Sequence, residues 1–388
     1  MTFAYFRPGL GVVGINPTCC NEPGPSRPQL WLTSDMVHWR NVTPRGLHRG
    51  AVPGDWPYLE RASFVDPRTG WVEAWNGDNL AVSVFRTRDG GRTWDAAPAG
   101  EQDAHAGADS RIQLLSPSVA YRDVVDPAGN DSPDLAVTTD GGITWRTVYT
   151  GPPRSADDLR EVGVGPHLQP MTFVTQSRGF AANGIPDYDA YGGATAGEFF
   201  STVDGGRQWS AVHLPASAAT RSCPKPQADE GTVSCTDSLP AFVDASDGVV
   251  TVAVRSRDKA VLSFDTTHDT GRTWQLATTT TVPMPVLGPN GTGVGVDFTF
   301  PLVAEPSLST WWVVSSRGRT VTTRVTDDGG EHWVVRSPLL LPGTLQQLTA
   351  LDASHAWALV EIQLGQGYVT DRLLRTDDGG RSWHAFLP

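Results

Sequence analysis

The chain has 388 residues, a formal net charge of −12 at pH 7 and only two lysines among its 30 basic residues. This balance argues against a nucleic-acid partner, because phosphate binding requires a basic face. No run of residues reaches the length of a membrane-spanning helix, and 41 glycines with 30 prolines indicate tight turns between short strands.

Residues 1–8 lack the basic, apolar and small-residue regions of an export signal. The chain is therefore expected either in the cytoplasm or, with a signal upstream of this sequence, in an extracytoplasmic or secreted location. Cys223 and Cys235 flank a loop rich in proline and glycine, and a disulfide between them would suit the second location, which we favour. The alternative is four unpaired thiols, because a bond between the adjacent Cys19 and Cys20 would be strained.

Four strands are predicted at the N-terminus, at residues 2–6, 11–15, 30–33 and 39–42. A short Thr-x-Asp-x-x-x-Trp segment joins the last two strands and contains Asp35 and Trp39. Six fuller copies, Thr-x-Asp-Gly-Gly-x-x-Trp, follow at spacings of 50 to 65 residues, with Thr270 in place of one glycine. We call each copy a box. The aspartates of the later boxes are Asp89, Asp140, Asp204, Asp269, Asp328 and Asp378, and their tryptophans are Trp94, Trp145, Trp209, Trp274, Trp333 and Trp383.

The residue types of the box predict a β-hairpin turn. The aspartate is expected to accept hydrogen bonds from backbone N–H groups just ahead of it. The glycines supply the positive φ that a tight hairpin requires. The tryptophan opens the next strand and is expected to cover the hairpin or to lie between neighbouring sheets. An aspartate repeated in this way is a structural bracket rather than a catalytic group.

A second hairpin precedes each box, as in Phe64-Val-Asp-Pro-Arg-Thr-Gly-Trp71 and in related segments that begin at Phe173, Phe242 and Leu351. Each consists of an apolar strand, a polar turn and a second apolar strand. Hairpin and box together give four antiparallel strands, A to D. Such a unit does not bury both of its faces alone, so it stacks on copies of itself.

The sequence therefore predicts an all-β fold, a single seven-bladed β-propeller with one box in the C–D turn of each four-stranded blade. Both ends of the chain supply whole blades, so we expect closure by blade packing without strand exchange, and a monomer. The expected blades are residues 1–45, 46–99, 100–149, 150–213, 214–280, 281–337 and 338–388.

These boxes resemble those of the Asp-box, or bacterial neuraminidase repeat (BNR), families. Members include sialidases, sortilin-type receptors and seven-bladed propellers similar to the photosystem II assembly factor Ycf48. The resemblance covers nearly the whole chain, and the hairpin from Phe64 to Trp71 is closer to the Ycf48-like repeat than to the sialidase repeat. It implies the sialidase-like propeller fold, but no single activity, because enzymes, receptors and assembly factors share the box. The composition, rich in arginine and poor in lysine, suggests a bacterial source.

A sialidase active site is not expected. Sialidases begin their first blade with Phe/Tyr-Arg-Ile-Pro, which Tyr5-Phe-Arg-Pro8 resembles. Residues 5–12, however, align without gaps with residues 64–71, which places Arg7 in an A–B turn, at the same end of the sheet as the boxes. That is the wrong end for sialidase chemistry, so Arg7 is not assigned the sialidase role.

No other catalytic motif stands out, since Gly-x-Ser-x-Gly, His-Glu-x-x-His and Cys-x-x-Cys are all absent from the sequence. We assign no catalytic residue, cofactor or metal site. The Asp-rich segments 126–134 and 187–189 offer oxygen ligands that suit calcium, but solvated acidic turns are the commoner outcome for such segments.

Ligand binding is expected at the long B–C and D–A loops, because loops tolerate variation while the blades hold them. Their aromatic, acidic and basic residues are a mixture that suits a glycan or a protein partner. The alternative is that Trp56 and Trp75 only seal loops onto the blades. The candidate residues are Trp56, Tyr58, Glu60, Arg61, Trp75, Asp78, Arg111, Asp187, Tyr188 and Tyr191.

Three functional classes remain open. The first is a non-catalytic binding or scaffold propeller that recognises a protein or a carbohydrate. The second is a glycoside hydrolase that uses two carboxylates on the loops, and the third is a purely structural module. We favour the first, because no catalytic motif transfers to this sequence.

Overall fold

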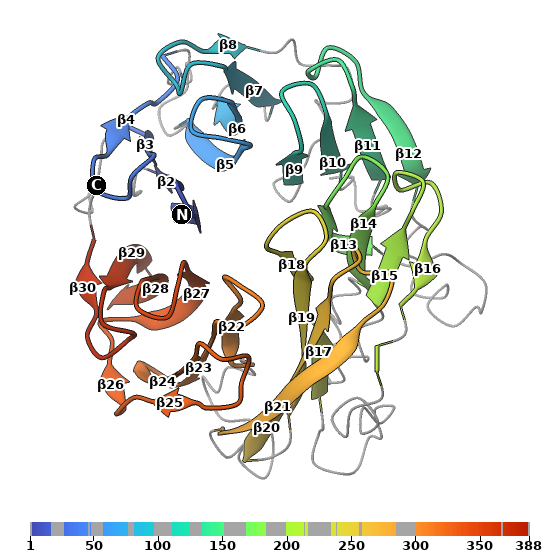
Figure 1. Cartoon of the computed structure of the whole chain (residues 1–388). Helices are drawn as coiled ribbons and strands as arrows, with labels where there is room; N and C mark the ends of the chain where they lie inside the picture. The colour runs from blue at the N-terminus through green and yellow to red at the C-terminus, as the bar shows by residue number, and fades with distance from the viewer. Residues whose placement is uncertain are drawn as a thin grey trace. The chain divides into compact units, whose positions relative to one another are not determined.

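Seven antiparallel β-sheets make up the computed structural model, and the fold is that of a seven-bladed β-propeller, as predicted (Figure 1). The structure describes residues 2–16, 27–45, 47, 57–76, 81–96, 111–124, 134–150, 168–183, 199–212, 214–215, 234–237, 239–255, 258–284, 300–365 and 368–386. This part of the chain contains no helix, and hence none that would cross a bilayer.

The chain divides into two compact units. One comprises Met1–Gly179, Thr202–Trp209 and Pro388, and the other comprises Phe180–Ser201 and Ser210–Leu387.

The first three sheets each run in simple sequential order. The first contains β1 (Thr2–Arg7), β2 (Leu10–Ile15), β3 (Gln29–Thr33) and β4 (Arg40–Asn41). The second contains β5 (Tyr58–Phe64), β6 (Gly70–Asn76), β7 (Ala81–Thr87) and β8 (Asp95–Ala96). The third contains β9 (Arg111–Leu114), β10 (Ala120–Val124), β11 (Asp134–Thr138) and β12 (Arg146–Thr150).

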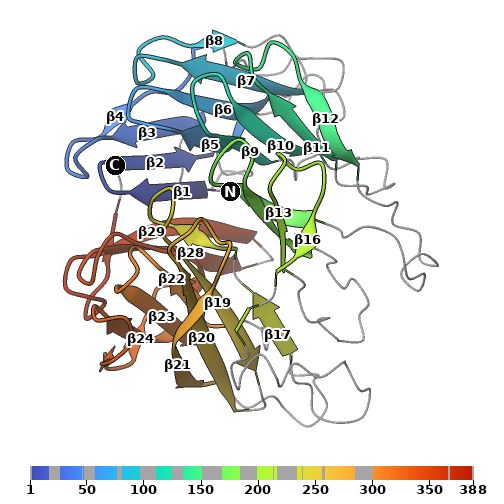
Figure 2. The ribbon, with the colours of Figure 1, turned by 45° about the vertical axis from the view of Figure 1, so that its right-hand side comes forward.

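The remaining sheets follow the same plan with two interruptions. The fourth contains β13 (Leu168–Phe173), β14 (Gly179–Asn183), β15 (Phe199–Thr202) and β16 (Ser210–Ala211). In the fifth, β17 (Ser234–Asp237) and β18 (Ala241–Phe242) both pair with β19 (Gly248–Arg255), followed by β20 (Lys259–Thr267) and β21 (Gln275–Pro283). β19, β20 and β21 lie side by side in Figure 2.

In the sixth sheet the outer strand is interrupted instead, because β25 (Val334–Val335) and β26 (Leu339–Leu340) both pair with β24 (Thr320–Thr326). Its inner strands are β22 (Leu302–Ala304) and β23 (Trp311–Arg317). The seventh contains β27 (Thr344–Ala350), β28 (Ala356–Gly365), β29 (Tyr368–Thr376) and β30 (His384–Ala385). The first and last sheets exchange no strand, as expected, whereas β12 and β21 run past the blade boundaries predicted at 149 and 280.

Each box forms the predicted turn between the third and fourth strands of its sheet. In the second sheet, Asp89 Oδ1 accepts hydrogen bonds from Thr93 N (2.9 Å) and from Thr87 Oγ1 (2.9 Å). Both box glycines have positive φ there, 74° and 78°. In the first box, Met36 takes this conformation at 60°, and in the fifth Thr270 takes it at 64°.

The A–B turn lies beside the box turn of the same sheet. The N–H of the first box glycine donates to the A–B turn, as Gly90 N does to Arg68 O at 2.7 Å and Gly141 N to Ser118 O at 2.9 Å. Both turns therefore lie at one end of each sheet, which we call the turn end. β1 itself runs through Arg7, so this residue ends a strand rather than sitting in the predicted turn. Its guanidinium donates to Val65 O, in the A–B turn of the second sheet, so Arg7 does lie at the turn end.

The box tryptophans pack between neighbouring sheets in several places, which is one of the two predicted arrangements. Trp145 of the third sheet meets Trp71 of the second edge to face, with ring centroids 6.2 Å apart. Trp274 meets Phe180 at 6.3 Å in the same way, and Trp383 meets Trp312 at 6.5 Å. The core of each unit is thus extended from sheet to sheet by aromatic contacts.

Candidate functional site

Half of the predicted ligand-binding residues, Trp56, Asp78, Asp187, Tyr188 and Tyr191, lie outside the described residues, as does Cys223. Tyr58 and Glu60 belong to β5, Arg111 begins β9, and Cys235 belongs to β17. Trp75 lies in β6 and not in the predicted loop, because β6 continues to pair with β5, where Tyr58 is its register partner. Of the segments considered for calcium, only Asp134, the first residue of β11, is described.

Arg61 belongs to β5 of the second sheet, and its side chain is partly buried. Its register partner is Glu73 of β6, so the two side chains lie on the same face of the sheet. Glu73 Oε1 lies 3.9 Å from Nε of Arg122 in β10, and both side chains are almost wholly buried, at 2% and 3% exposure. Glu73 and Arg122 therefore form a buried ion pair of the kind that supports structure, and Arg61 is the neighbour of Glu73 across the sheet.

A hollow of about 490 Å³ lies at the turn ends of the third and fourth sheets, and we call it the turn-end pocket. The sequence analysis missed it, because that analysis expected ligands at the B–C and D–A loops. The third sheet contributes Tyr121, Val137, Thr139 and Arg146 to its lining, and the turns of the fourth contribute Thr175, Gln176, Ser177, Asp204, Gly205 and Arg207.

Tyr121 joins the two sheets at this pocket. Its ring stacks on Phe173 of β13 with centroids 3.5 Å apart and planes within 1°. Its hydroxyl donates to Gln176 O at 2.5 Å and approaches Gly205 O at 3.4 Å. Burial raises the pKa of Tyr121, and the positive charges of Arg207 and Arg146 oppose that rise. Tyr121 therefore stays a neutral donor at ordinary pH, and both guanidinium groups act on it electrostatically.

The two arginines of the pocket are exposed and differ in their contacts. Arg207 Nη1 donates to the carbonyl of Asp204 at 3.2 Å, within its own turn. Arg146 begins β12 and pairs with Val137 through its backbone, but its side chain makes no hydrogen bond or ion pair to the residues that the structure describes. Arg40, which also follows a box tryptophan, instead donates to Gly90 O of the next sheet at 3.4 Å.

The one carboxylate of the pocket is bound by its own turn. Asp204 Oδ1 accepts hydrogen bonds from Thr202 Oγ1 at 2.9 Å and from Arg207 N and Gln208 N at 3.0 Å each. Burial alone would raise the pKa of Asp204, but these hydrogen bonds hold it below its usual value. Asp204 therefore remains ionised and is not suited to proton transfer near neutral pH.

Two carboxyl groups with raised pKa values lie in the other unit, and neither lines the pocket. Burial raises the pKa of Asp265 to about 6 and that of Glu305 to about 7. Asp265 is register partner to Val250, whereas Glu305 accepts a hydrogen bond from the next residue, Thr251, at 2.6 Å. Successive strand residues face opposite sides of a sheet, so the two carboxyls lie against opposite faces and do not form a catalytic pair.

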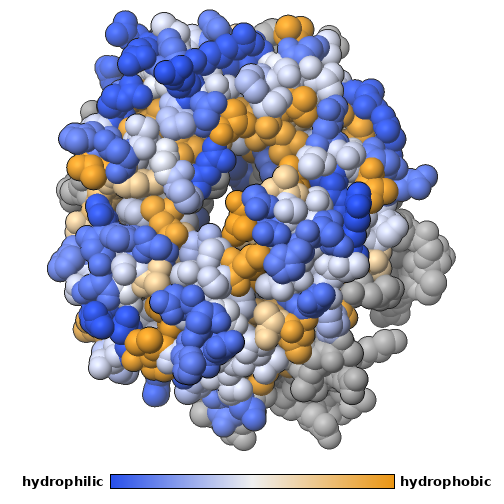
Figure 3. Space-filling model, viewed as in Figure 1, coloured by the Kyte–Doolittle hydropathy of each residue, from blue (hydrophilic) through white to orange (hydrophobic). Residues whose placement is uncertain are grey.

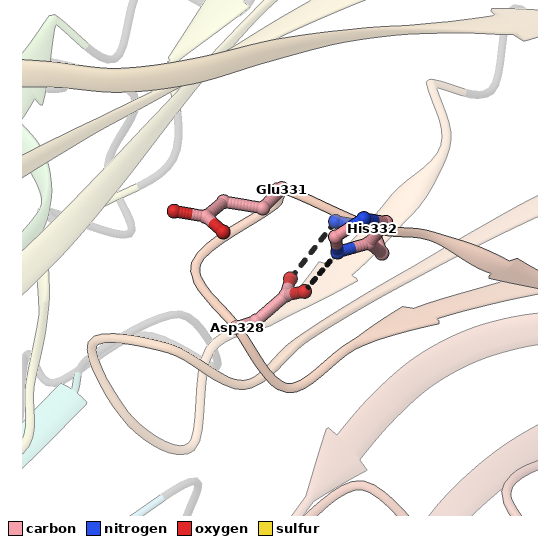
Figure 4. A group of neighbouring side chains, drawn as sticks. All are labelled: Asp328, Glu331 and His332. Carbon is pink, nitrogen blue, oxygen red and sulfur yellow. Dashed lines mark hydrogen bonds and ion pairs between the residues drawn. The ribbon is translucent and has the colours of Figure 1, made fainter.

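Asp328, Glu331 and His332 form the acidic and imidazole cluster of the sixth box (Figure 4). His332 Nδ1 lies 2.7 Å from Asp328 Oδ2, where Thr93 and Thr144 place a hydroxyl at 2.6 Å from their own box aspartates. Glu331 lies beside this pair in Figure 4 with no hydrogen bond drawn to it, and one oxygen of its carboxylate lies within 4.8 Å of both partners. His332 therefore takes the position of the hydroxyl cap in this box.

A comparison with known proteins finds no matching family model and no matching curated protein. Among solved structures, a prolyl endopeptidase aligns with 99% of this chain and 49% of its own, at a TM-score of 0.54 and 11% identity. The chain thus spans about half the length of that enzyme. An uncharacterized protein from Listeria monocytogenes EGD-e aligns over 98% of this chain and 92% of its own, at a TM-score of 0.54 and 7% identity. An ulvan lyase aligns over 99% and 90%, at a TM-score of 0.45 and 10% identity. The two likenesses with a TM-score of 0.54 show the fold alone.

Proposed function

We propose that the protein is a non-catalytic binding propeller of the Asp-box class, similar to the Ycf48-like propellers, which recognises a glycan or a protein. The turn-end pocket is the observation that carries this proposal. Its lining offers hydroxyl, amide and guanidinium groups for binding, while its only carboxylate, Asp204, is held ionised by its own turn.

The class assignment is supported by the geometry of the boxes. In six of them, a threonine hydroxyl and an aspartate carboxylate bind the turn backbone in the same way, as Thr202 and Asp204 illustrate. Such a turn is a structural unit. It therefore supports the Asp-box class but says nothing about activity, which is argued from the pocket.

A glycoside hydrolase is the less supported alternative. It would need two carboxyl groups facing one cleft, and Asp265 and Glu305 do not provide them.

On the face drawn in Figure 3, hydrophobic and hydrophilic residues are interspersed over much of the surface. That mixture favours a polar ligand over a broad apolar partner on this face.

The B–C and D–A loops remain a second proposed surface. Replacement of Trp56, Trp75 and Tyr188 together is expected to weaken ligand binding with little change in melting temperature. A large loss of stability would instead assign these residues to packing.

A glycan array, probed with the purified protein with and without calcium, tests the proposal. Specific binding without turnover of the bound glycan is expected. Hydrolysis of that glycan would overturn the non-catalytic assignment. A blank array, followed by failure to capture any protein partner, would favour the purely structural module.

A further inference from the structure

We propose that the turn-end pocket binds the acid group of an anionic sugar through Arg146 and Arg207. The inference rests on the proposed function and names the ligand class for it. A sugar carboxylate or sulfate ester is the group that these two side chains fit.

The pocket lies where one register pair differs between two neighbouring junctions of sheets. In the second sheet, Arg86 is the register partner of Trp71, and its guanidinium donates to Gly141 O in the next box. The equivalent pair in the third sheet is Val137 and Tyr121. Valine is too short to reach the next box, so Tyr121 contacts the carbonyls there and the space above Val137 stays open.

Charge in the pocket favours an anion. Two guanidinium groups face one carboxylate, and three hydrogen bonds within the turn already engage Oδ1 of that Asp204 carboxylate. The side chain of Arg146 has no hydrogen-bond or ion-pair partner among the described residues, so its guanidinium donors are available to a ligand. The chain as a whole has a net charge of −12, so the two arginines give this pocket a charge of opposite sign to that of the whole chain. A planar guanidinium pairs with a carboxylate or a sulfate through two parallel hydrogen bonds.

The rest of the lining fits a sugar ring better than a bare inorganic anion. Hydroxyl and amide groups of Thr139, Ser177 and Gln176 surround the pocket, while Tyr121 and Val137 supply apolar surface. The volume of about 490 Å³ lies within the range of about 300–1,000 Å³ that is typical of small-ligand sites. A sugar acid uses both parts, because its hydroxyls bind the polar rim and its acid group binds the arginines.

Titration calorimetry with matched sugars tests the inference. Oligogalacturonate carries carboxylates, its fully methylated ester is the neutral match, and a sulfated galactan carries sulfate alone. Binding of oligogalacturonate or of the sulfated galactan, but not of the ester, is expected, and the pattern tells carboxylate from sulfate. Higher salt should weaken this binding, because exposed charges are screened.

Three single variants locate the site. Arg146→Gln and Arg207→Gln are each expected to weaken binding of the acidic sugar by about 10- to 100-fold. Arg272→Gln is the matched control, because Arg272 has the same position in the fifth box as Arg207 has in the fourth and lies outside the pocket. It should bind as the natural protein does, and all three should keep the same melting temperature.

Val137→Arg provides an independent test. It rebuilds the Arg86 arrangement over Gly205 and fills the pocket, so the acidic sugar should no longer bind while the melting temperature is kept or raised.

Acidic-sugar binding that survives both arginine variants would overturn the inference and leave the proposed function intact. Selective binding of neutral glycans would do the same, whereas no binding to any glycan would reject the inference together with the glycan arm of the proposed function.

Discussion

The junction of the second and third sheets and the junction of the third and fourth share one plan but end differently. At the first, Arg86 passes over Trp71, with its guanidinium carbon 6.0 Å from the ring, and holds the carbonyl of Gly141. At the second, Tyr121 makes the contact, Val137 replaces the arginine and a pocket remains. The two junctions therefore differ in one register pair, Trp71 and Arg86 against Tyr121 and Val137, and the pocket lies at the second.

The tryptophans that both junctions share should give the largest effects. Trp145 packs on Trp71 of the neighbouring second sheet at 6.2 Å, whereas Trp209 packs at 6.1 Å on Phe173 of its own sheet, whose ring stacks on Tyr121 of the third. Trp145→Ala and Trp209→Ala are each expected to lower the free energy of unfolding by about 3–5 kcal/mol, because each leaves a cavity between aromatic groups. Denaturant unfolding measures this loss. If either variant lost less than about 1 kcal/mol, the ring would not be a common support of the two junctions.

The sixth sheet differs from the second at the residue that faces the start of the second strand across the A–B hairpin. This difference should produce the next largest effect. In the second sheet, the Phe64 ring covers Gly70, where an added Cβ would come within 2.2 Å of it. The equivalent residues of the sixth sheet are Glu305 and Trp311, and Trp311 stacks on Phe264 at 4.5 Å. A carboxyl thus stands where the second, fourth and fifth sheets place a phenylalanine ring.

Glu305→Gln should therefore change how stability depends on pH. Burial raises the pKa of Glu305 to about 7 in the folded protein, above its value of about 4.3 in an unfolded chain. Its contribution is fully present below the unfolded pKa and is lost as pH rises through about 7. At pH 8 the variant should be more stable than the natural protein by about 1–2 kcal/mol, while keeping the acceptor for Thr251.

Unfolding at pH 5 and at pH 8 measures the Glu305 effect. Asp95→Asn, at an exposed position of β8, is the control and should leave the pH dependence unchanged. Equal pH dependence in the natural protein and in Glu305→Gln would show that another group causes it.

Variants of Arg86 and Arg146 test the comparison of the two junctions directly, because the Arg86 side chain binds across its junction and that of Arg146 does not. Arg86→Val should cost about 1–2 kcal/mol, because the variant loses a charge-assisted hydrogen bond to Gly141 and a contact with Trp71. Arg146→Gln should change stability by less than about 0.5 kcal/mol, because its side chain makes no such contact. If both variants lost the same stability, Arg146 would be a structural residue and the comparison would fail.

The sequence predicted the repeated parts of the fold and not the exceptions to them. The box glycines, aspartates and tryptophans are local signals, so their residue types predicted the turns. Their regular spacing predicted the seven sheets. The β6 strand was predicted too short at Trp75, because its end depends on pairing with Tyr58 and Ala81 across the sheet. The turn-end pocket was missed, because it depends on residues of two sheets. Arg86 and Val137 can both be read from the sequence. That they occupy equivalent positions follows only from the strand pairing within each sheet.

The smallest predicted effect concerns the caps of the boxes. Asp328 is capped by the imidazole of His332, whereas Asp89 is capped by the hydroxyl of Thr93. The hydrogen bond and charge of Asp328 raise the pKa of His332, so the stability that this pair contributes is present below about pH 6.5 and is lost as pH rises through the folded pKa. His332→Thr should remove this dependence. Because the pair is exposed, the difference in melting temperature between pH 5.5 and pH 8 should change by less than about 2 °C. A larger change would mean that the imidazole supports more than its own turn, whereas an unchanged profile would mean that the two kinds of cap are equivalent.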